Sequence, residues 1–563
     1  MRRGSLLLVL LVSCTSGAPR DLARRTASRV VLLSFDGLGA DALARHSDLP
    51  AFAQLEHDGM FVERVTPVTP CQTSSAHVAI LTGAPPRVTG IVANKFHKPG
   101  TPWTEVTDGF SADIDAETLI QAAHRAGKRV GSIAFPTVDT RRPADFGIVY
   151  SDAIVRSRII HLTRSDFRSE WMPPGWGERP SRHISYSPVL RAPIEWMRSE
   201  VDIVAYDTTD DHVRNYDAFF VEKRDAEVAP DSRGWFSISS RTPDALYGSW
   251  SKLMRTTATL DDIAIYWGGI HGTAGYPDSF RQMIDDEAGF WPGAPDERFA
   301  QEHIEGRDGI DGDTFAEQNE RFAQFFASAT ALAIRRMPFD LLLAYEPIID
   351  KAEHQFLISS DAQAYATAEN RAIGESVRAR TFIAADRALK TIGDALDPSQ
   401  DALVVTGDHG LAPIDAEVHL KRLLAEWGLD QQWVAFASGG GVAHLYRIAG
   451  GAASELAAHF KDTGFIERID AKSHPNSGDL VLYAYPHVGL SASGGEAVTK
   501  PHTYGQHGGI GSHAEFQTVL IAWGAGVPHG VVPESSQTQI AGYVAALLGM
   551  DPPQKADRAP IAP

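Results

Sequence analysis

The stretch Arg29-Val-Val-Leu-Leu-Ser-Phe-Asp36 is an almost unbroken apolar run that ends in a carboxylate. Such a run predicts a strand that is buried on both faces of a sheet. The pattern recurs in Phe339–Tyr345, which leads to Asp350 and His354, and in Ala402–Gly407, which leads directly to Asp408 and His409. Three strands with polar groups at their carboxyl ends predict a site at one edge of the sheet.

Helical patterns lie between these strands and complete the fold class. We expect a helix over 116–126 capped by Asp115, and a longer one over 362–395 capped by Asp361. The remaining expected elements are strands over 129–135 and 518–523 and a closing helix over 537–548. Alternating strands and helices predict an α/β fold, with a doubly wound, mostly parallel sheet flanked by helices.

The region 151–335 interrupts this alternation. It is rich in Trp, Tyr, Pro and Asp and has no clear strand–helix repeat. We interpret it as an inserted cap over the active site, because long insertions are often functional; the alternative is a separate domain unrelated to catalysis. The core then comprises residues 26–150 and 336–563, and residues 1–25 form a targeting segment.

Composition sets limits on the partners. The chain has 563 residues, of which 43% are hydrophobic and 22% charged, as in ordinary globular proteins. Its formal net charge of −19 argues against binding to a nucleic-acid duplex, which needs clustered Lys and Arg. The composition leaves the oligomeric state open.

The first residues resemble an export signal. Arg2 and Arg3 precede the apolar run Leu6–Val12, which is too short to span a membrane, and Cys14 follows. This pattern is typical of a bacterial lipoprotein, which would place the protein in the periplasm or on the cell surface, attached to the membrane only through a lipid on Cys14. The alternative is a secreted protein cleaved near Ala18. Cys71 is the other cysteine, so no internal disulfide is expected.

Mass spectrometry of the mature protein tests this prediction. We expect a diacylglyceryl group on Cys14 as the new N-terminal residue. A free N-terminus just after Ala18 would indicate simple secretion instead.

The residues at the strand ends suit metal ions. Carboxylate and imidazole ligands together favour zinc, with manganese or iron as weaker alternatives, whereas an all-oxygen set would favour calcium or magnesium. Asp350 and His354 are four residues apart and would share one face of a helical turn. Any one of these pairs alone is a weak signal, since an Asp-His pair after a strand often only caps a turn. Because such residues follow all three strands, together they predict a metal site.

The segment Thr69–Gly83 is predicted to be a loop that enters a short helix near Ser74. A hydroxyl at a helix N-terminus faces free N–H groups and the positive end of the helix dipole, which favour an alkoxide and a bound phosphate. Thr73 is therefore a candidate nucleophile. The alternative, an ordinary N-cap without chemistry, is not excluded by this segment alone.

This segment resembles the nucleophile region of the alkaline phosphatase superfamily. There the nucleophile lies nine residues before the Thr of a Thr-Gly pair, as Thr73 lies before Thr82-Gly83. The sequence that follows, up to Asn94 at 21 residues after Thr73, resembles that of one branch of the superfamily. This branch holds the type I phosphodiesterases/nucleotide pyrophosphatases and the phosphate-irrepressible alkaline phosphatases. Sulfatases are disfavoured, because no Cys-x-Pro-x-Arg motif is present.

The resemblance implies a complete set of site residues. It implies two divalent metal ions, which we expect to be zinc. One ion would be bound by Asp36, Asp408, His409 and the Thr73 hydroxyl. The other would be bound by Asp350, His354 and His507. Thr73 would form a covalent phosphothreonine intermediate, and Asn94 would donate a hydrogen bond to the phosphoryl group. His502 and His513 are competing positions for His507, and His271 is expected to be structural.

Three departures from the family pattern bear on the substrate. Thr89 stands where a His is usual, and Ser74 where phosphodiesterases often carry an aromatic residue that holds a nucleobase. The Lys-x-Arg pair of the monoesterases is replaced by Ala134-Phe135-Pro136, with Arg141 and Arg142 as possible substitutes. The resemblance implies a small-molecule phosphate ester as the substrate, and the departures lead us to predict a phosphodiesterase. The alternatives are a phosphomonoesterase, a phosphonate hydrolase, and a non-catalytic surface-binding lipoprotein.

Overall fold

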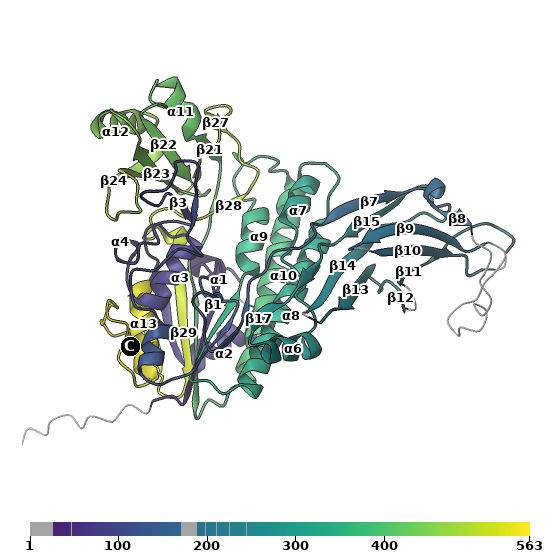
Figure 1. The fold of residues 1–563 in the computed structure, drawn as a ribbon, viewed down its shortest axis with the longest axis horizontal. Coiled ribbons are helices and arrows are strands. Elements are labelled where there is room, and N and C mark those ends of the chain that lie inside the picture. The colour runs from purple at the N-terminus through teal and green to yellow at the C-terminus, as the bar shows by residue number, and fades with distance from the viewer. Residues whose placement is uncertain are drawn as a thin grey trace, which may run out of the picture.

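The computed structural model describes residues 26–46, 48–169, 188–197, 199–209, 211–223, 226–243, 245–437 and 439–563 (Figure 1). Cys14, Ala18 and the rest of the expected targeting segment lie outside these residues. In the part of the chain that the structure describes, no helix is both long and apolar enough to cross a membrane.

The core is a nine-stranded sheet with the strand order β17-β6-β5-β18-β1-β19-β29-β2-β30. Neighbours from β6 to β19 are parallel, as are β2 and β30, whereas β17 and β29 run antiparallel to their neighbours. The strands are β1 (Arg29–Phe35), β2 (Met60–Thr66), β5 (Val130–Ile133), β6 (Phe146–Val149), β17 (Ala274–Tyr276), β18 (Leu341–Glu346), β19 (Asp401–Gly407), β29 (Thr518–Gly524) and β30 (Gly530–Ser536). The predicted α/β fold with a mostly parallel sheet is confirmed.

The three strands that carry the predicted ligands are neighbours at the centre of this sheet. β1 lies between β18 and β19, and Phe35 is in register with Glu346 on one side and Gly407 on the other. Because the three strands are parallel and end at the same register position, Asp36 and Asp408 follow them at the same edge of the sheet. Asp350 follows on α9 (Ile348–Phe356), which begins just beyond β18 at that edge.

Helices cover both faces of the sheet, which explains the unbroken apolar run of β1. Val31, Leu33 and Phe35 pack in one cluster, and Val30 and Leu32 pack in the other. The first cluster contains residues of α1 (Ala40–Ala44), α2 (Pro50–Asp58), α6 (Asp278–Glu287), α8 (Gly312–Arg336), α9 and α10 (Ala368–Gly393); the second contains residues of α3 (Thr73–Thr82), α5 (Leu119–Arg125) and α13 (Ile540–Leu547). Successive residues point to opposite faces, so both faces demand apolar side chains.

Two predicted helix starts are wrong by several residues. α5 begins after Thr118, whose side chain and that of Gln121 form a capping box, while Asp115 pairs with His474 at 3.2 Å. α10 begins after Thr367, whose hydroxyl accepts a hydrogen bond from the Asn370 N–H. In both cases a later Thr satisfies the free N–H groups of the first turn, so the earlier Asp is left to pair elsewhere. The closing helix begins as a 3₁₀ turn at Gln537–Gln539 and continues as α13.

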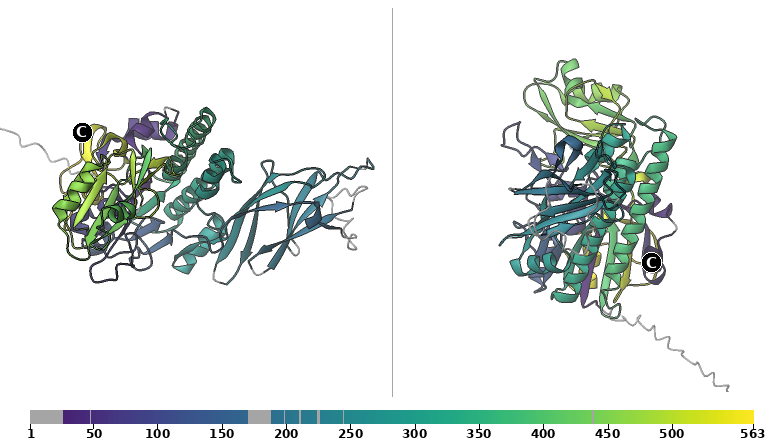
Figure 2. Two further views of the ribbon diagram at one scale, coloured as in Figure 1. Left: turned by 90° about the horizontal axis from the view of Figure 1, so that it is seen from above. Right: turned by 90° about the vertical axis from the view of Figure 1, so that its right-hand side faces the viewer.

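Part of the region 151–335 forms a β-sandwich that projects away from the core (Figures 1 and 2). One sheet has the order β12-β11-β10-β9-β8 and the other β13-β14-β15-β7, with β16 pairing β14. The strands are β7 (Arg158–Leu162), β8 (Arg168–Ser169), β9 (Leu190–Trp196), β10 (Ser199–Tyr206), β11 (Ala218–Lys223), β12 (Ala226–Val228), β13 (Trp235–Arg241), β14 (Leu246–Arg255), β15 (Ile263–Trp267) and β16 (His271–Gly272). Both sheets contribute to a core of their own that includes Trp196, Ile203 and Ile265.

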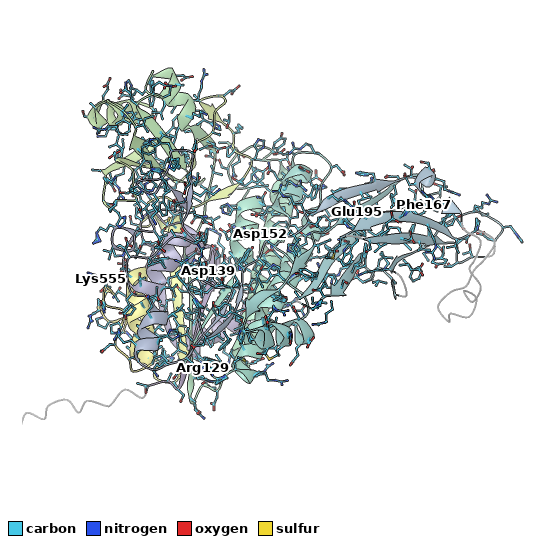
Figure 3. The ribbon with its side chains drawn as sticks, in the orientation of Figure 1. Arg129, Asp139, Asp152, Phe167, Glu195 and Lys555 are labelled. Carbon is cyan, nitrogen blue, oxygen red and sulfur yellow. The ribbon has the colours of Figure 1, made fainter. Side chains whose placement is uncertain are left out.

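The structure divides the expected insertion differently from the sequence analysis. After the sandwich, β17 joins the edge of the central sheet, and α6, α7 (Glu297–Ile304) and α8 pack on the core. Figure 3 places Phe167 and Glu195 on the projecting sandwich, whereas Asp152 lies where it meets the core. Among the described residues of 151–335, only Asp152 lines the main cavity, so they do not form the expected cover.

A second, smaller domain lies between β19 and β29, where the sequence analysis expects only core. Its sheet has the order β22-β23-β25-β24, and two helices pack on it (Figure 1). The elements of this region are β20 (Ala412–Pro413), β21 (Ala416–His419), α11 (Leu420–Glu426), β22 (Trp433–Ala437), β23 (Val442–Arg447), α12 (Ala453–Asp462), β24 (Ile466–Ala471), β25 (Leu480–Ala484), β26 (Val488–Ser491), β27 (Val498–Thr499) and β28 (Gly505–Gln506). This small domain borders the cavity, whereas the described residues of the sandwich do not.

Candidate active site

Thr73 is the first residue of α3, directly after the extended residue Gln72. The side chain of Thr73 is nearly buried, and its Oγ1 lies 3.3 Å from Nε2 of His409. α3 ends at Gly83, whose φ of 67° is the left-handed conformation that glycine adopts without strain. The predicted nucleophile therefore sits at a helix N-terminus and beside a predicted metal ligand.

The first predicted ligand set is gathered around His409. Its Nε2 lies 3.1 Å from Oδ2 of Asp408 and 3.6 Å from Oδ1 of Asp36. One potential ligand atom from each of these three residues lies within 4.8 Å of the others, and all three side chains are buried. Together with the Thr73 hydroxyl, they match the set that the resemblance implies.

The second set is arranged around Asp350. Its Oδ1 lies 3.2 Å from Nε2 of His354 and 3.8 Å from Nε2 of His507. The tighter grouping of ligand atoms here is Asp350 with His507 and His409, because the rings of His409 and His507 stack at 3.7 Å between centroids. His354 is thus close to Asp350 but lies outside this grouping.

The buried oxygens at the centre of these sets fit a cation. Asp36 Oδ1, Asp350 Oδ1 and Asp408 Oδ2 are buried and have no hydrogen-bond partner. Leaving such acceptors unpaired costs free energy, and a divalent ion would satisfy them. Burial and the neighbouring carboxylates raise the pKa of Asp36 well above its ordinary value and that of Asp408 to about 8. Excess negative charge of this kind is what bound cations neutralise.

The imidazole groups are prepared for the same role. Burial lowers the pKa of His507 to about 4, and it also lowers the pKa of His409. A neutral imidazole can ligate a metal. Nδ1 of His507 lies 3.2 Å from the Cys71 carbonyl and Nδ1 of His354 lies 2.7 Å from the Gly505 carbonyl. Donation from Nδ1 directs Nε2 of each ring toward Asp350, at 3.8 Å for His507 and 3.2 Å for His354.

The competing histidines are placed elsewhere. His513 pairs with Glu467 at 2.8 Å, and His502 pairs with Glu305 at 2.6 Å. His271 lies in a different, small cavity beside Trp235 and Trp250. Of these positions only His507 adjoins Asp350.

Asn94 is oriented for the donor role that the resemblance implies. Its side-chain oxygen accepts a hydrogen bond from the Ser74 N–H at 2.9 Å. Its backbone N–H donates to the side chain of Gln72 at 2.7 Å. Because Oδ1 is engaged on α3, the Nδ2 group is the part of the side chain available to the cavity, which Asn94 lines together with Thr73.

Two residues that the sequence analysis missed, His77 and Tyr345, contact the predicted site residues. His77, one helical turn after Thr73, has Nδ1 2.8 Å from the Thr73 carbonyl and 3.4 Å from Asp408, and Nε2 2.9 Å from Ser34. Burial lowers the pKa of His77 to about 3, so the ring is neutral. The hydroxyl of Tyr345 donates to Asp36. The four-residue spacing from Thr73 was the available signal for His77.

A cavity of about 690 Å³ opens above these groups. The core supplies Phe110, the stretch 134–139 and Tyr150, and the small domain supplies Ile414, Glu417 and Gly489 among others. Figure 3 places Asp139, which also lines the cavity, on the core. A cavity of this size is typical of small-molecule sites, which agrees with a small phosphate ester as the substrate.

The cations around the cavity are already engaged. Lys351 lines it and pairs with Glu297 at 3.2 Å. Arg141 is 64% exposed and pairs with Asp139. Arg142 donates to the carbonyls of Phe110 and Ala112, each at 2.6 Å. Neither arginine lines the cavity, so neither takes the place of the absent Lys-x-Arg pair.

The buried Asp and His groups at the carboxyl ends of the central strands could hold metal ions, which is a type of site found in metal-dependent hydrolases. The chain belongs to the type I phosphodiesterase / nucleotide pyrophosphatase family, which it matches over residues 30–510. It is therefore a hydrolase of this metal-dependent family, whose members act on phosphoric ester bonds, and the predicted branch of the alkaline phosphatase superfamily is confirmed.

Several known proteins are similar to it. The bis(5'-adenosyl)-triphosphatase enpp4 of Xenopus laevis is 26% identical over 193 residues, which cover 33% of this chain and 40% of that protein. The matched part thus spans less than half of this relative. Murine ectonucleotide pyrophosphatase / phosphodiesterase 5 has 13% identity and a TM-score of 0.49, over 93% of this chain and 96% of its own. A phosphonoacetate hydrolase from Sinorhizobium meliloti 1021 has 15% identity and a TM-score of 0.48, over 94% and 96%.

Proposed function

We propose that this chain is a phosphodiesterase that works through a covalent phosphothreonine intermediate on Thr73. The observation that carries the proposal is the position of the Thr73 hydroxyl, at a helix N-terminus and 3.3 Å from His409, within a cluster of unpaired buried carboxylate oxygens. A hydroxyl becomes a strong nucleophile when its pKa is lowered, which the helix N-terminus favours and which metal ions held by these carboxylates would strengthen.

The residues divide into two ligand sets. Asp36, Asp408 and His409 with Thr73 would hold one divalent ion, and Asp350, His354 and His507 the other. We propose zinc for both, because the donor set mixes carboxylates and imidazoles. Bound ions supply Lewis acidity, which lowers the pKa of the attacking hydroxyl and stabilises charge on the phosphoryl oxygens.

The chain's own groups account for the other parts of the reaction. In the first step Thr73 Oγ1 gives up its proton and forms a bond to phosphorus, while the bond from phosphorus to the leaving oxygen breaks and that oxygen takes up a proton. In the second step a water molecule gives up a proton as its oxygen bonds to phosphorus, the Oγ1–phosphorus bond breaks, and Oγ1 takes up a proton to restore the hydroxyl. The Asn94 amide donates to a phosphoryl oxygen in both steps. His77 holds the backbone of Thr73 and lies next to Asp408.

The cavity wall favours a diester over a monoester. A monoester dianion carries one more negative charge and benefits from additional cations. The wall after β5 is apolar at Ala134, Phe135 and Pro136, and Arg142 is committed to backbone carbonyls. An apolar wall suits the second substituent of a diester.

A comparison of esters with one leaving group tests this preference. We expect kcat/KM for bis-p-nitrophenyl phosphate or thymidine 5'-p-nitrophenyl phosphate to exceed that for p-nitrophenyl phosphate by about tenfold or more. Each activity should be lost after chelation and return with zinc. A monoester that is turned over more efficiently than both diesters would contradict the proposal.

A phosphomonoesterase or phosphonate hydrolase is the alternative that one observation favours. Lys351 is a cation that lines the cavity and lies 3.9 Å from Asp350. If monoesters are preferred, Lys351→Gln should reduce that preference, because the additional charge would then lose its partner.

A further inference from the structure

One rim of the cavity is a short loop, residues 108–112, which we name the rim loop. Asp108, Phe110 and Ser111 of this loop line the cavity together with Thr73 and Asn94. Phe110 is half-buried, so part of this residue remains accessible. What this ring contacts depends on the substrate, and the inference below therefore rests on the proposed function.

The rim loop is anchored to the side of the site that would bind phosphate. The N–H of Gly109 donates to the carbonyl of Asn94 at 2.8 Å, and Asn94 is in turn bonded to the first turn of α3. A methyl group added at Gly109 would lie 2.6 Å from Oγ of Ser74 and 2.3 Å from the Ala93 carbonyl. The loop backbone thus packs directly on Ser74, and Phe110 is the next residue after this contact.

This packing explains why residue 74 is small. Ser74 is fully buried under Gly109, and a large side chain there would displace the loop. An aromatic ring directly after Thr73 is therefore incompatible with the rim loop in its present position. The ring that borders the cavity beside Asn94 comes from Phe110 instead.

Arg142 fixes the loop from behind. Its Nη2 donates to the Phe110 carbonyl and its Nη1 to the Ala112 carbonyl, each at 2.6 Å. Two donors of one planar guanidinium hold two carbonyls of one loop in a fixed orientation, an arrangement that the single ammonium group of lysine does not reproduce. The backbone N–H of Arg142 donates to Asp139 at 3.1 Å, which fixes the arginine itself.

Of the other aromatic side chains at the cavity, Phe135 and Tyr345 are buried, whereas Tyr150 is 38% exposed but is held by contacts with other rings. Phe135 is 1% exposed and packs edge-on against His77. Tyr345 is bonded to Asp36. The ring of Tyr150 makes edge contacts with Trp291, Phe322 and Tyr345.

We propose that Phe110 determines specificity by stacking on a planar aromatic or heteroaromatic substituent that stays on phosphorus, and that Arg142 is a positioning residue that acts through the rim loop. Stacking needs a ring held at a fixed angle, because offset and edge-to-face geometries are the favoured ones. A substituent without a ring gains little from either residue. The rim loop would thereby supply the aromatic surface that Ser74 lacks.

The test compares two esters that differ in the retained substituent, thymidine 5'-p-nitrophenyl phosphate and methyl p-nitrophenyl phosphate. Phe110→Ala should lower kcat/KM about tenfold for the thymidine ester, mainly through KM. The same variant should change the methyl ester less than about twofold. Phe110→Leu keeps the apolar bulk without the flat face and should give an intermediate loss.

Arg142→Gln should shift the same ratio in the same direction. In a Phe110→Ala background it should have little further effect on the ratio, because residues that act through one contact are not additive. Arg141→Gln removes the same charge from the neighbouring exposed arginine and serves as the matched control, with both esters unchanged. Thermal denaturation of each variant checks that the fold is intact, and Arg142→Lys replaces Arg142→Gln if that variant does not fold.

Two outcomes would overturn the proposal. Equal losses on both esters would show that the loop only supports the phosphoryl site, and fully additive losses in the double variant would show that Arg142 does not act through Phe110. The proposed function fails separately, if the wild-type enzyme prefers the monoester. A wild-type diesterase in which Phe110→Ala leaves both esters unchanged would refute only this inference.

Discussion

Replacing Thr73 by alanine should remove nearly all turnover, by about a thousandfold or more, and leave the metal content unchanged. The change deletes the oxygen that forms the covalent intermediate, and variants that lose a nucleophile fall to the residual activity of the remaining site. The six carboxylate and imidazole side chains are untouched, so the metals should stay bound. Steady-state kinetics on a p-nitrophenyl diester, with metal analysis of the same sample, measures both effects.

Thr73→Ser is the matched control, because it keeps a hydroxyl at the N-terminus of α3. It should retain a substantial part of the activity and still form a phosphorylated protein under acid quench. If Thr73→Ala kept most of the wild-type rate, water would have to attack phosphorus directly, and the covalent mechanism would be wrong.

Removal of the metals should abolish activity and also change how stability depends on pH. In the metal-free protein, burial raises the pKa of Asp408 to about 8, and that of Asp36 is raised as well. His354 has its pKa raised to about 9: burial opposes the shift, but the charge of Asp350 outweighs it. These groups keep their protons in the folded state at pH values where the unfolded chain has lost them.

The sign follows from proton linkage. A group with a raised folded pKa contributes stability below its unfolded pKa, and that contribution is lost as pH rises toward the folded value. Between pH 6.5 and 8, the contributions of Asp408 and His354 to the free energy of unfolding both fall, at up to about 1.4 kcal/mol per pH unit for each group. The lowered pKa values of His409 and His507 act in the opposite direction, but only below pH 6.5. The free energy of unfolding of the metal-free protein should therefore fall from pH 6.5 to 8.

Metal ions should reverse this trend, because they bind the deprotonated ligands and compete with protons less as pH rises. Denaturant titrations with and without zinc at pH 6.5 and pH 8 measure the difference. Glu346, whose pKa burial raises to about 8, contributes equally in both states and cancels. Stabilisation by zinc that does not grow between these pH values would contradict the assignment of Asp36, Asp408 and His354 to the metal sites.

Much of the fold could be predicted because it depends on patterns within single segments. The runs ending at Phe35, Tyr345 and Gly407 are mostly apolar, and in the structure each is a central strand with helices on both faces. Helix starts were less predictable: Asp115 and Thr118 can both cap a first turn, and the partner His474, distant in sequence, engages the former.

The region 151–335 shows where sequence patterns fail. β9 alternates between buried and more exposed residues, and α6 and α7 each bury one face, but nothing local indicates which stretch returns to the central sheet. β17 does so through pairing with β6, whereas β7 to β16 build a sandwich around a separate core. Likewise, the small domain that borders the cavity is set by pairing among β22, β23, β25 and β24.

The sequence by itself determined the central strands, the helix that begins near Ser74 and the Asp and His residues that follow the strands, because chemistry and periodicity over a few residues suffice for these; the role expected of His507 came from the family resemblance. Only the tertiary structure decided that Tyr345 bonds to Asp36, that His77 lies beside Asp408, and that the rim loop closes over Ser74. These contacts join residues from different elements, and their geometry depends on how strands and helices pack. A pattern within one segment does not encode that packing, so the shape of the cavity became visible only in the folded chain.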